Sequence, residues 1–309
     1  MAVVPDARVA VRDRALRRQQ HAENFPVALR LLPRQLRTSL VAVYDVARVI
    51  DDLGDQAAGD RTALLTAFAR DLARIWDGGR PPQHPVLRRL VPVVQTHGLG
   101  QEPFQRLVRA NLVDQRVRRY ATYAQLRGYC TLSADSIGRI VLALFGMGAA
   151  GQDAPVATEL SDRVCTALQL IEHWQDVAED RRAGRVYLPG EDLAAFGVAE
   201  AELDGAVASP ALRRLMAFQI TRAAELLDSG APLVGLLHGW GRLAVAGYIA
   251  GGRAALDALR RAHGDVLAGP PHPRRRDLLR HLTSVLFKYH QPGRGRSSTA
   301  TNRRREEVG

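Results

Sequence analysis

Two pairs of aspartates are the residues of this chain best suited to chemistry. Asp51 and Asp55 are four residues apart, and so are Asp176 and Asp180. At 3.6 residues per turn, the two members of each pair project from one face of a helix. Glu172 adds a carboxylate one turn before Asp176. Like charges at this spacing destabilise a helix, and carboxylates beside apolar residues are costly, so these groups need a counter-charge.

A divalent cation would supply that counter-charge. Mg²⁺ prefers oxygen ligands, keeps several waters and often joins one or two carboxylates to substrate phosphates. The predicted metal ligands are Asp51, Asp55, Glu172, Asp176 and Asp180. If the two pairs face each other across a helical cavity, they form a trap for a diphosphate group, and Arg48 and Arg185 close on its oxygens. The alternative is that each pair is a solvated helix face and that each arginine only neutralises a neighbouring aspartate.

The elements that must position these pairs are helices. Apolar residues recur at helical spacing along the chain, and no alternating run is long enough to build a sheet. The predicted helices are 36–53, 62–76, 84–97, 101–118, 122–130, 133–148, 159–178, 198–207, 212–228, 232–251, 253–263 and 274–289, with a loop over 184–196. No long linker separates them. The sequence therefore predicts one all-α domain over 20–290, between a lead-in at 1–19 and a disordered basic tail at 291–309.

Composition narrows the class of protein. Of 309 residues, 46% are hydrophobic and 24% charged, which excludes a collagen-like, coiled-coil or wholly disordered chain. The two cysteines form neither a disulfide framework nor a zinc motif. The first 18 residues lack an apolar run of signal-peptide length, and the most apolar stretch, 233–252, is interrupted by His238 and Arg242. We expect a cytoplasmic protein.

The net charge of +11 favours a partner that carries phosphate. A basic surface attracts nucleic acid, anionic lipid or a diphosphate substrate. A nucleic-acid partner would leave the two acidic pairs unexplained, so none is expected. The arginine clusters 274–276 and 303–305 either contact the surface of a membrane or are simply solvated.

The residues around both pairs resemble the motifs of the squalene/phytoene synthase family. The first aspartate-rich motif corresponds to Tyr44, Arg48, Asp51-Asp52 and Asp55, and the second to 175–189, ending in Gly184-Arg185-Val186-Tyr187-Leu188-Pro189. The likeness covers roughly residues 20–290. Two further stretches, 23–33 and 129–139, resemble the hopanoid-associated hydroxysqualene synthase branch. Ser133-Ala134 stands where the sister branches tend to carry Val-Ala.

The resemblance implies an isoprenoid synthase fold around a central apolar cavity, and a Mg²⁺-dependent reaction that needs no NADPH. Presqualene diphosphate and water would give hydroxysqualene and diphosphate, within squalene and hopanoid biosynthesis. The implied substrate is a prenyl diphosphate, and the implied functional partner is presqualene diphosphate synthase. The alternative within the family is head-to-head condensation of two prenyl diphosphates to presqualene diphosphate or phytoene.

The resemblance also implies roles for individual residues. The catalytic residues would be Asp51, Asp55, Asp176 and Asp180, and Asp52 and Tyr187 would contact substrate. Three further residues have two interpretations each. Tyr44 either donates a hydrogen bond to the diphosphate or packs, Ser133 either orients the capturing water or bonds back to its helix, and His21 either reaches the diphosphate or is structural.

The sequence departs from the family pattern at two positions. Glu172 stands where the family often has Asn, and Gln56 stands where Glu is usual. A carboxylate at 172 can still bind Mg²⁺, but its added charge is expected to change the affinity for the metal.

Overall fold

The computed structural model describes residues 32–147 and 153–290. Over these ranges the chain is helical with no β-strand, and a single isolated bridge joins Arg119 to Val186. The predicted all-α fold is confirmed. The lead-in, His21, the stretch 23–31 and the basic tail lie outside the described residues.

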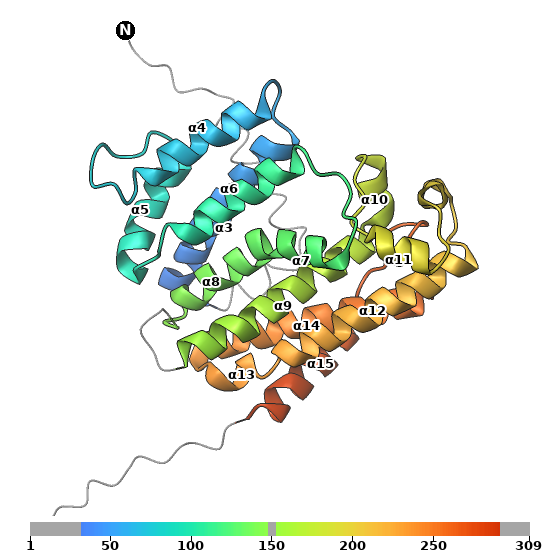
Figure 1. The fold of residues 1–309 in the computed structure, drawn as a ribbon. Coiled ribbons are helices and arrows are strands. Elements are labelled where there is room, and N and C mark those ends of the chain that lie inside the picture. The colour runs from blue at the N-terminus through green and yellow to red at the C-terminus, as the bar shows by residue number, and fades with distance from the viewer. Residues whose placement is uncertain (1–31, 148–152, 291–309) are drawn as a thin grey trace, which may run out of the picture.

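The described helices follow one another through short connections (Figure 1). They are α3 (Arg34–Asp55), α4 (Arg61–Ala73), α5 (Pro85–His97), α6 (Glu102–Asp114), α7 (Tyr123–Leu132), α8 (Ala134–Leu144), α9 (Ala154–Gln175), α10 (Val177–Arg182), α11 (Gly190–Ala195), the 3₁₀ turn η1 (Glu200–Asp204), α12 (Pro210–Gly230), α13 (Leu233–Leu236), α14 (Gly239–Arg261) and α15 (Arg275–Lys288).

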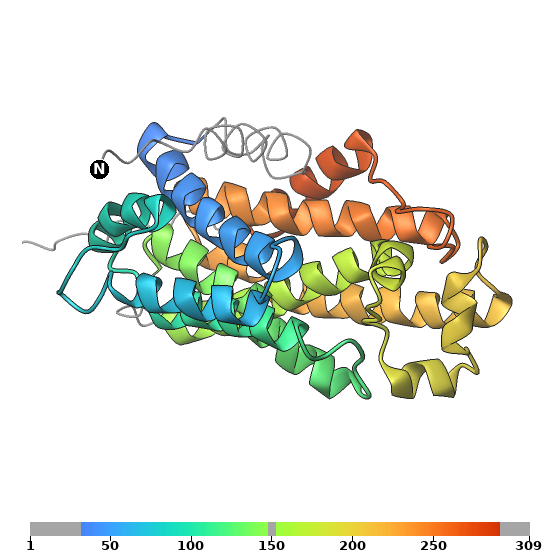
Figure 2. The same ribbon diagram turned by 90° about the horizontal axis from the view of Figure 1, so that it is seen from above.

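The helices pack in two groups. One apolar cluster is centred on α3 to α6 and includes Ile50 and Phe104, both fully buried. The other is centred on α9, α12 and α14 and includes Trp174. Helix α8 supplies Ile140 to the first cluster and Leu142 to the second, so it joins the two groups. Figures 1 and 2 show α3 to α6 on one side and α12 to α15 on the other, with α8 and α9 between them.

The predicted loop over 184–196 contains a short helix, α11, so that prediction was incomplete. Six residues are too few for a stable isolated helix. Tertiary contacts hold it, because the carboxylate of Asp192 accepts hydrogen bonds from Gln219 Nε2 (2.8 Å) and Arg222 Nη1 (2.7 Å) on α12. No local sequence signal announces such long-range bonds.

The predicted boundary between helices 232–251 and 253–263 was wrong. Helix α14 runs unbroken through Gly251 and Gly252, and the actual break lies before it, at Leu237–His238. A Cβ at Gly252 would lie only 2.6 Å from Leu168 Cδ2 and 3.0 Å from Leu227 Cδ2. This glycine therefore permits close packing of α14 against α9 and α12 and does not end the helix.

Candidate active site

The first acidic motif occupies the last three turns of α3. Tyr44, Arg48, Asp51 and Asp55 follow one another at intervals of four, three and four residues, as predicted, and share one face of the helix. Tyr44 is half-buried. The neighbouring face buries Ile50 completely. Packing of that apolar face fixes the helix, so the carboxylates are presented by a rigid element.

Helix α6 holds Asp51 in place. Asn111 Nδ2 donates a hydrogen bond of 3.0 Å to Asp51 Oδ1, and Gln115 Nε2 donates one of 3.0 Å to the carbonyl of Gly54. A Cβ at Gly54 would lie 2.3 Å from Asn111 Oδ1. The glycine between the two aspartates is thus required for α6 to approach and orient Asp51.

Arg48 and Asp52 form an ion pair along α3. Arg48 Nε lies 3.3 Å from Asp52 Oδ1, yet this nitrogen is buried and makes no hydrogen bond. A buried donor without a partner is costly. An anion bound beside α3 would satisfy it, which is consistent with the predicted role of Arg48 in contacting diphosphate.

The second acidic motif lies at a break between two helices. The sequence predicted one helix through Ala178, but α9 ends at Gln175, and Asp176 has a non-helical conformation (φ −102°, ψ 15°) before α10 begins. Two backbone bonds keep the turn spacing, from Asp176 N to Glu172 O (3.0 Å) and from Asp180 N to Asp176 O (2.8 Å). The three carboxylate residues therefore still follow one another one turn apart.

An ion pair joins the two motifs. Arg185 Nη1 lies 2.7 Å from Asp55 Oδ1, across 130 positions of sequence. Burial alone would lower the pKa of the Arg185 guanidinium, but its bond to Asp55 and the attraction of the surrounding acidic groups together outweigh burial, and the pKa is raised. The segment after α10 is anchored by hydrogen bonds from Arg185 N to Asp180 O and from Val186 N to Arg118 O. Arg185 therefore carries a fixed positive charge between the two acidic helices.

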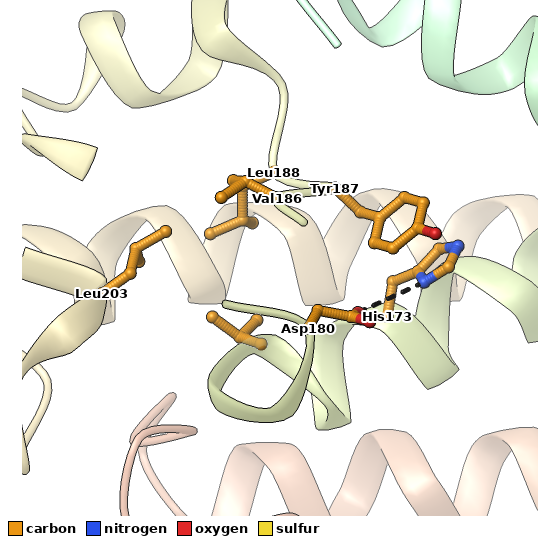
Figure 3. A pocket seen from close by; sticks show the side chains of 7 residues that line it. His173, Asp180, Val186, Tyr187, Leu188 and Leu203 are labelled. Atoms are coloured by element: carbon orange, nitrogen blue, oxygen red, sulfur yellow. Dashed lines mark ion pairs between the residues drawn. The ribbon is translucent and has the colours of Figure 1, made fainter. Parts of the chain in front are cut away.

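His173 and Tyr187 line a small pocket beside the second motif (Figure 3). The two rings stack with centroids 3.7 Å apart, and His173 Nδ1 lies 3.7 Å from Asp180 Oδ2. His173 Nε2 is buried without a partner. The pocket has a cavity volume of about 10 Å³, close to what one water molecule needs. It therefore does not by itself hold a prenyl substrate.

A cluster of buried tyrosines adjoins this pocket. Tyr187 stacks on Tyr120, and Tyr129 lies against both rings. Tyr129 donates a hydrogen bond of 2.6 Å to Asp114 Oδ2. Burial raises the pKa of Asp114 to about 6, and burial also raises the pKa of Tyr129 well above its usual value. Tyr187, expected to contact substrate, is 7% exposed and lies in the wall of this cluster.

Ser133 lies at the break between α7 and α8, not inside a helix. Its hydroxyl donates a hydrogen bond of 2.6 Å to Gln169 Oε1 on α9 and also lies 3.3 Å from the carbonyl of Tyr129. The hydroxyl bonds back to the last turn of α7, as one interpretation predicted, and its role in orienting the capturing water stays a prediction.

The carboxylates are chemically suited to a hard cation. Burial, reinforced by Asp55 and Asp52 and opposed by Asn111 and Arg48, raises the pKa of Asp51 to about 6. Burial followed by repulsion from Glu172, Asp180 and Glu179 raises the pKa of Asp176 to about 6. A divalent cation would offset this uncompensated charge. In the part of the chain that the structure describes, no three His, Cys, Asp or Glu side chains group closely enough to hold a metal by themselves. The oxygen-only donor set fits Mg²⁺ held by carboxylates together with water and substrate phosphates.

Sequence reasoning missed several residues of this region. Gln169 and His173 share the helix face of Asp176, and continuing the one-turn spacing backwards from Asp176 would have found them. Asn111 and Asp114 belong to α6, far from both motifs in the sequence, and no local pattern pairs them with Asp51 and Tyr129.

The two cysteines have no place in this chemistry. Cys130 and Cys165 are free thiols, and burial raises the pKa of each to about 12. Thiols held in the neutral form by burial are unreactive, so both act as packing residues.

Solved structures and a family model show the class of protein to which this chain belongs. A crystal structure of squalene synthase HpnC from Alicyclobacillus acidocaldarius is 38% identical, with a TM-score of 0.72 over 84% of this chain and 97% of that one. The fold is that of an isoprenoid synthase, and the class is that of prenyl diphosphate-dependent synthases. The family model for squalene/phytoene synthase matches residues 18–280, and the chain belongs to that family.

Curated relatives include more than one activity. The hydroxysqualene synthase of Zymomonas mobilis is 31% identical over 222 residues, which is 70% of this chain and 71% of that protein. The 15-cis-phytoene synthase of Synechococcus elongatus is 30% identical over 218 residues, 68% of this chain and 70% of that protein. The described helices include none long and apolar enough to cross a bilayer. The cytoplasmic location stays a prediction.

Proposed function

We propose that the protein converts presqualene diphosphate and water to hydroxysqualene and diphosphate, with Mg²⁺ and without NADPH, in squalene and hopanoid biosynthesis. The observation that carries the proposal is the Arg185–Asp55 ion pair, because it brings a guanidinium of the second motif onto a carboxylate of the first. A diphosphate placed between the motifs would meet carboxylates for its metal ions and arginines for its own oxygens.

The residues proposed to hold Mg²⁺ are Asp51, Asp55, Glu172, Asp176 and Asp180. When bound, the metal supplies Lewis-acid assistance to the departure of diphosphate. Arg48 and Arg185 neutralise the charge on the leaving group, and the buried Nε atoms of both arginines make no hydrogen bond and can donate to it. Asp52 orients Arg48 through its ion pair.

The reaction balances without a reductant. The bond between the carbinyl carbon next to the cyclopropane ring and the diphosphate oxygen breaks, and its electron pair leaves with diphosphate. The carbocation rearranges, a water oxygen forms the new carbon–oxygen bond, and one proton is released. Ser133 and Gln169 are a polar pair among the helices α7, α8 and α9 and can accept a hydrogen bond from that water.

The same fold admits a second reaction, head-to-head condensation of two prenyl diphosphates, and the 15-cis-phytoene synthase relative favours keeping it as the alternative. The sequence stretches that resemble the hydroxysqualene synthase branch, together with the hydroxysqualene synthase relative from Zymomonas mobilis, support water capture over condensation. On this proposal a separate presqualene diphosphate synthase supplies the substrate.

Two parallel incubations with Mg²⁺ and no NADPH test the proposal. One receives presqualene diphosphate, and the other receives farnesyl diphosphate. Hydroxysqualene with released diphosphate from the first alone is the expected result. Presqualene diphosphate accumulating in the second would replace the proposal with the condensation reaction.

The role of Ser133 is tested separately with the variant Ser133→Ala. If this variant still gives only hydroxysqualene at the wild-type rate, Ser133 has no part in the mechanism.

A further inference from the structure

Helix α15 carries apolar and basic side chains together on its exposed face. Five residues of α15 are spaced so that they share one side of the helix. They are Arg276, Leu279, Arg280, Thr283 and Phe287. All five are exposed, with Phe287 87% and Leu279 62% accessible. These residues are the outer face of α15. Among the large apolar side chains of the described residues, Phe287 is the most exposed, and Leu279 lies two turns before it on the same side of the helix.

The opposite side of α15 is fixed to the protein. Asp277 and Val285 are buried there, and Arg261 Nη1 on α14 lies 2.6 Å from Asp277 Oδ2. Arg242 Nη2 donates hydrogen bonds of 2.9 and 3.3 Å to the carbonyls of Leu286 and Tyr289, at the carboxyl end of α15. Figures 1 and 2 both show α15 on the outside of the molecule, packed against α14. The outer face is therefore presented by an anchored helix.

The charge around the outer face is positive. Helix α15 has four basic side chains and one acidic one, and the acidic one is the buried Asp277. Arg280 forms ion pairs with both Asp257 (2.7 Å) and Asp277 (3.7 Å). The side chain of Arg276 is 74% exposed, and its Nε lies 4.0 Å from Asp277. At the same end of the α14–α15 pair as Phe287, Trp240 is 40% exposed in the first turn of α14.

We propose that the outer face of α15 docks the protein onto the surface of an anionic lipid bilayer. Basic side chains are attracted to anionic headgroups, while exposed Leu, Phe and Trp side chains enter the boundary between headgroups and acyl chains. A second copy of this chain would not complement the face, because it would bring the same arginines together. The helix lies on the membrane and does not cross it.

Flotation of the full-length protein with vesicles tests this inference without any turnover, so its failure and that of the proposed function are distinguishable. Phosphatidylcholine vesicles with and without phosphatidylglycerol are compared. We expect binding only with phosphatidylglycerol and weakening by salt. The fluorescence should shift to shorter wavelength on binding, and the shift should be lost in Trp240→Phe, which retains the other two tryptophans, Trp76 and Trp174.

Variants locate the contact. The double variant Leu279→Ser/Phe287→Ser should bind phosphatidylglycerol vesicles more than ten-fold more weakly than the wild type. The single variant Arg276→Gln should bind them about five-fold more weakly. The matched controls are Val207→Ser with Val156→Ser, at side chains 63% and 54% exposed elsewhere, and Arg88→Gln on α5, all expected to bind as wild type. Phe287→Ser alone serves as a variant that cannot disturb the core.

Three results would overturn the inference. The first is equal binding to both kinds of vesicle. The second is unchanged binding by the α15 variants, with binding lost when the arginines at 303–305 are replaced. The third is a dimer in sedimentation velocity that the α15 variants convert to monomer while no vesicle binding occurs, because the occupant would then be a second copy.

Discussion

Arg185 Nη1 and Asp55 Oδ1 lie 2.7 Å apart, and this contact brings the two acidic motifs of the chain together. Arg185 follows α10, and Asp55 is the last residue of α3. The pair is half-exposed on the aspartate side and more enclosed on the arginine side. A guanidinium held beside a carboxylate at the rim of the site can exchange that partner for an incoming diphosphate, which presents more oxygens in a geometry that a guanidinium fits.

Replacing Arg185 should reduce catalysis far more than stability. For Arg185→Gln we expect kcat/KM for presqualene diphosphate to fall about 100-fold, the usual effect of removing a donor aimed at developing negative charge. Arg185→Lys should recover only part of the loss, because lysine lacks the planar fork. Arg253→Gln, which breaks an exposed ion pair with Asp228, is the control and should keep full activity. Equal losses in both would reduce Arg185 to a generic surface charge.

Neutralising either predicted metal-binding aspartate should abolish turnover and leave the fold intact. Asp51→Asn and Asp176→Asn each remove a charge from a crowded acidic group, so thermal stability should be equal to or above that of the wild type. Turnover and the Mg²⁺ concentration needed for it are the measurements, with Asp228→Asn as the exposed control. Wild-type rates in either variant would remove that residue from the metal site.

Gly54→Ala tests how α6 positions the first motif. The new methyl group would lie 2.3 Å from Asn111 Oδ1, so the Asn111 side chain must move out of its place beside Asp51, at a cost of about 1–3 kcal/mol. Activity should fall with stability, because Asn111 also orients Asp51. Chemical denaturation of Gly54→Ala and of Gly54→Ala with Asn111→Ala is the measurement, and the double variant should regain stability.

The control for this clash is Gly251→Ala in α14, where no atom lies within 4 Å of the new methyl group. That variant should be more stable by about 0.5–1 kcal/mol, since alanine favours a helix interior. Equal behaviour of the two glycine variants would contradict the packing argument.

Asp135 should make stability depend on pH. It is 1% exposed, accepts a hydrogen bond of 2.8 Å from Thr166, and burial raises its pKa to about 7. In the unfolded chain its pKa is ~3.9. Between the two pKa values the carboxyl of Asp135 is protonated in the folded protein and ionised in the unfolded chain. The free energy of unfolding is therefore higher at low pH and falls as the pH rises towards and through 7.

Asp135→Asn removes this dependence and keeps an oxygen that Thr166 can bond. We expect the variant to exceed the wild type in unfolding free energy by about 1–4 kcal/mol at pH 8 and to match it near pH 4. Denaturation at both pH values is the measurement. A difference that is constant with pH would show that Asp135 is ionised in the folded protein.

Much of the fold follows from helical periodicity. The faces that bury Ile50 and Trp174 are continuous apolar stripes, and such patterns locate helices well. Helix ends were less predictable. Asp176 leaves the helical conformation although the sequence pattern continues, and Gly252 lies inside α14, where Leu168 and Leu227 approach it too closely for a larger residue. The pattern 172, 176, 180 kept its turn spacing through the break, since the backbone bonds across it persist.

The acidic motifs were visible in the sequence, but their surroundings were not. The contact of Arg185 with Asp55 and that of Asn111 with Asp51 join elements far apart in the chain. Side chains such as Asn111 and Gln169 have ordinary types and no motif of their own. Their importance comes from three-dimensional position, which spacing along one helix does not encode.

The most direct test of the account is the source of the product oxygen. The purified protein is incubated with presqualene diphosphate and Mg²⁺, without NADPH, in water enriched in a heavy oxygen isotope, and the products are analysed by mass spectrometry. We expect hydroxysqualene with one heavy oxygen atom on carbon, and inorganic diphosphate without it. Presqualene alcohol with unlabelled oxygen, formed by cleavage at phosphorus, or the absence of any hydroxysqualene, would contradict it.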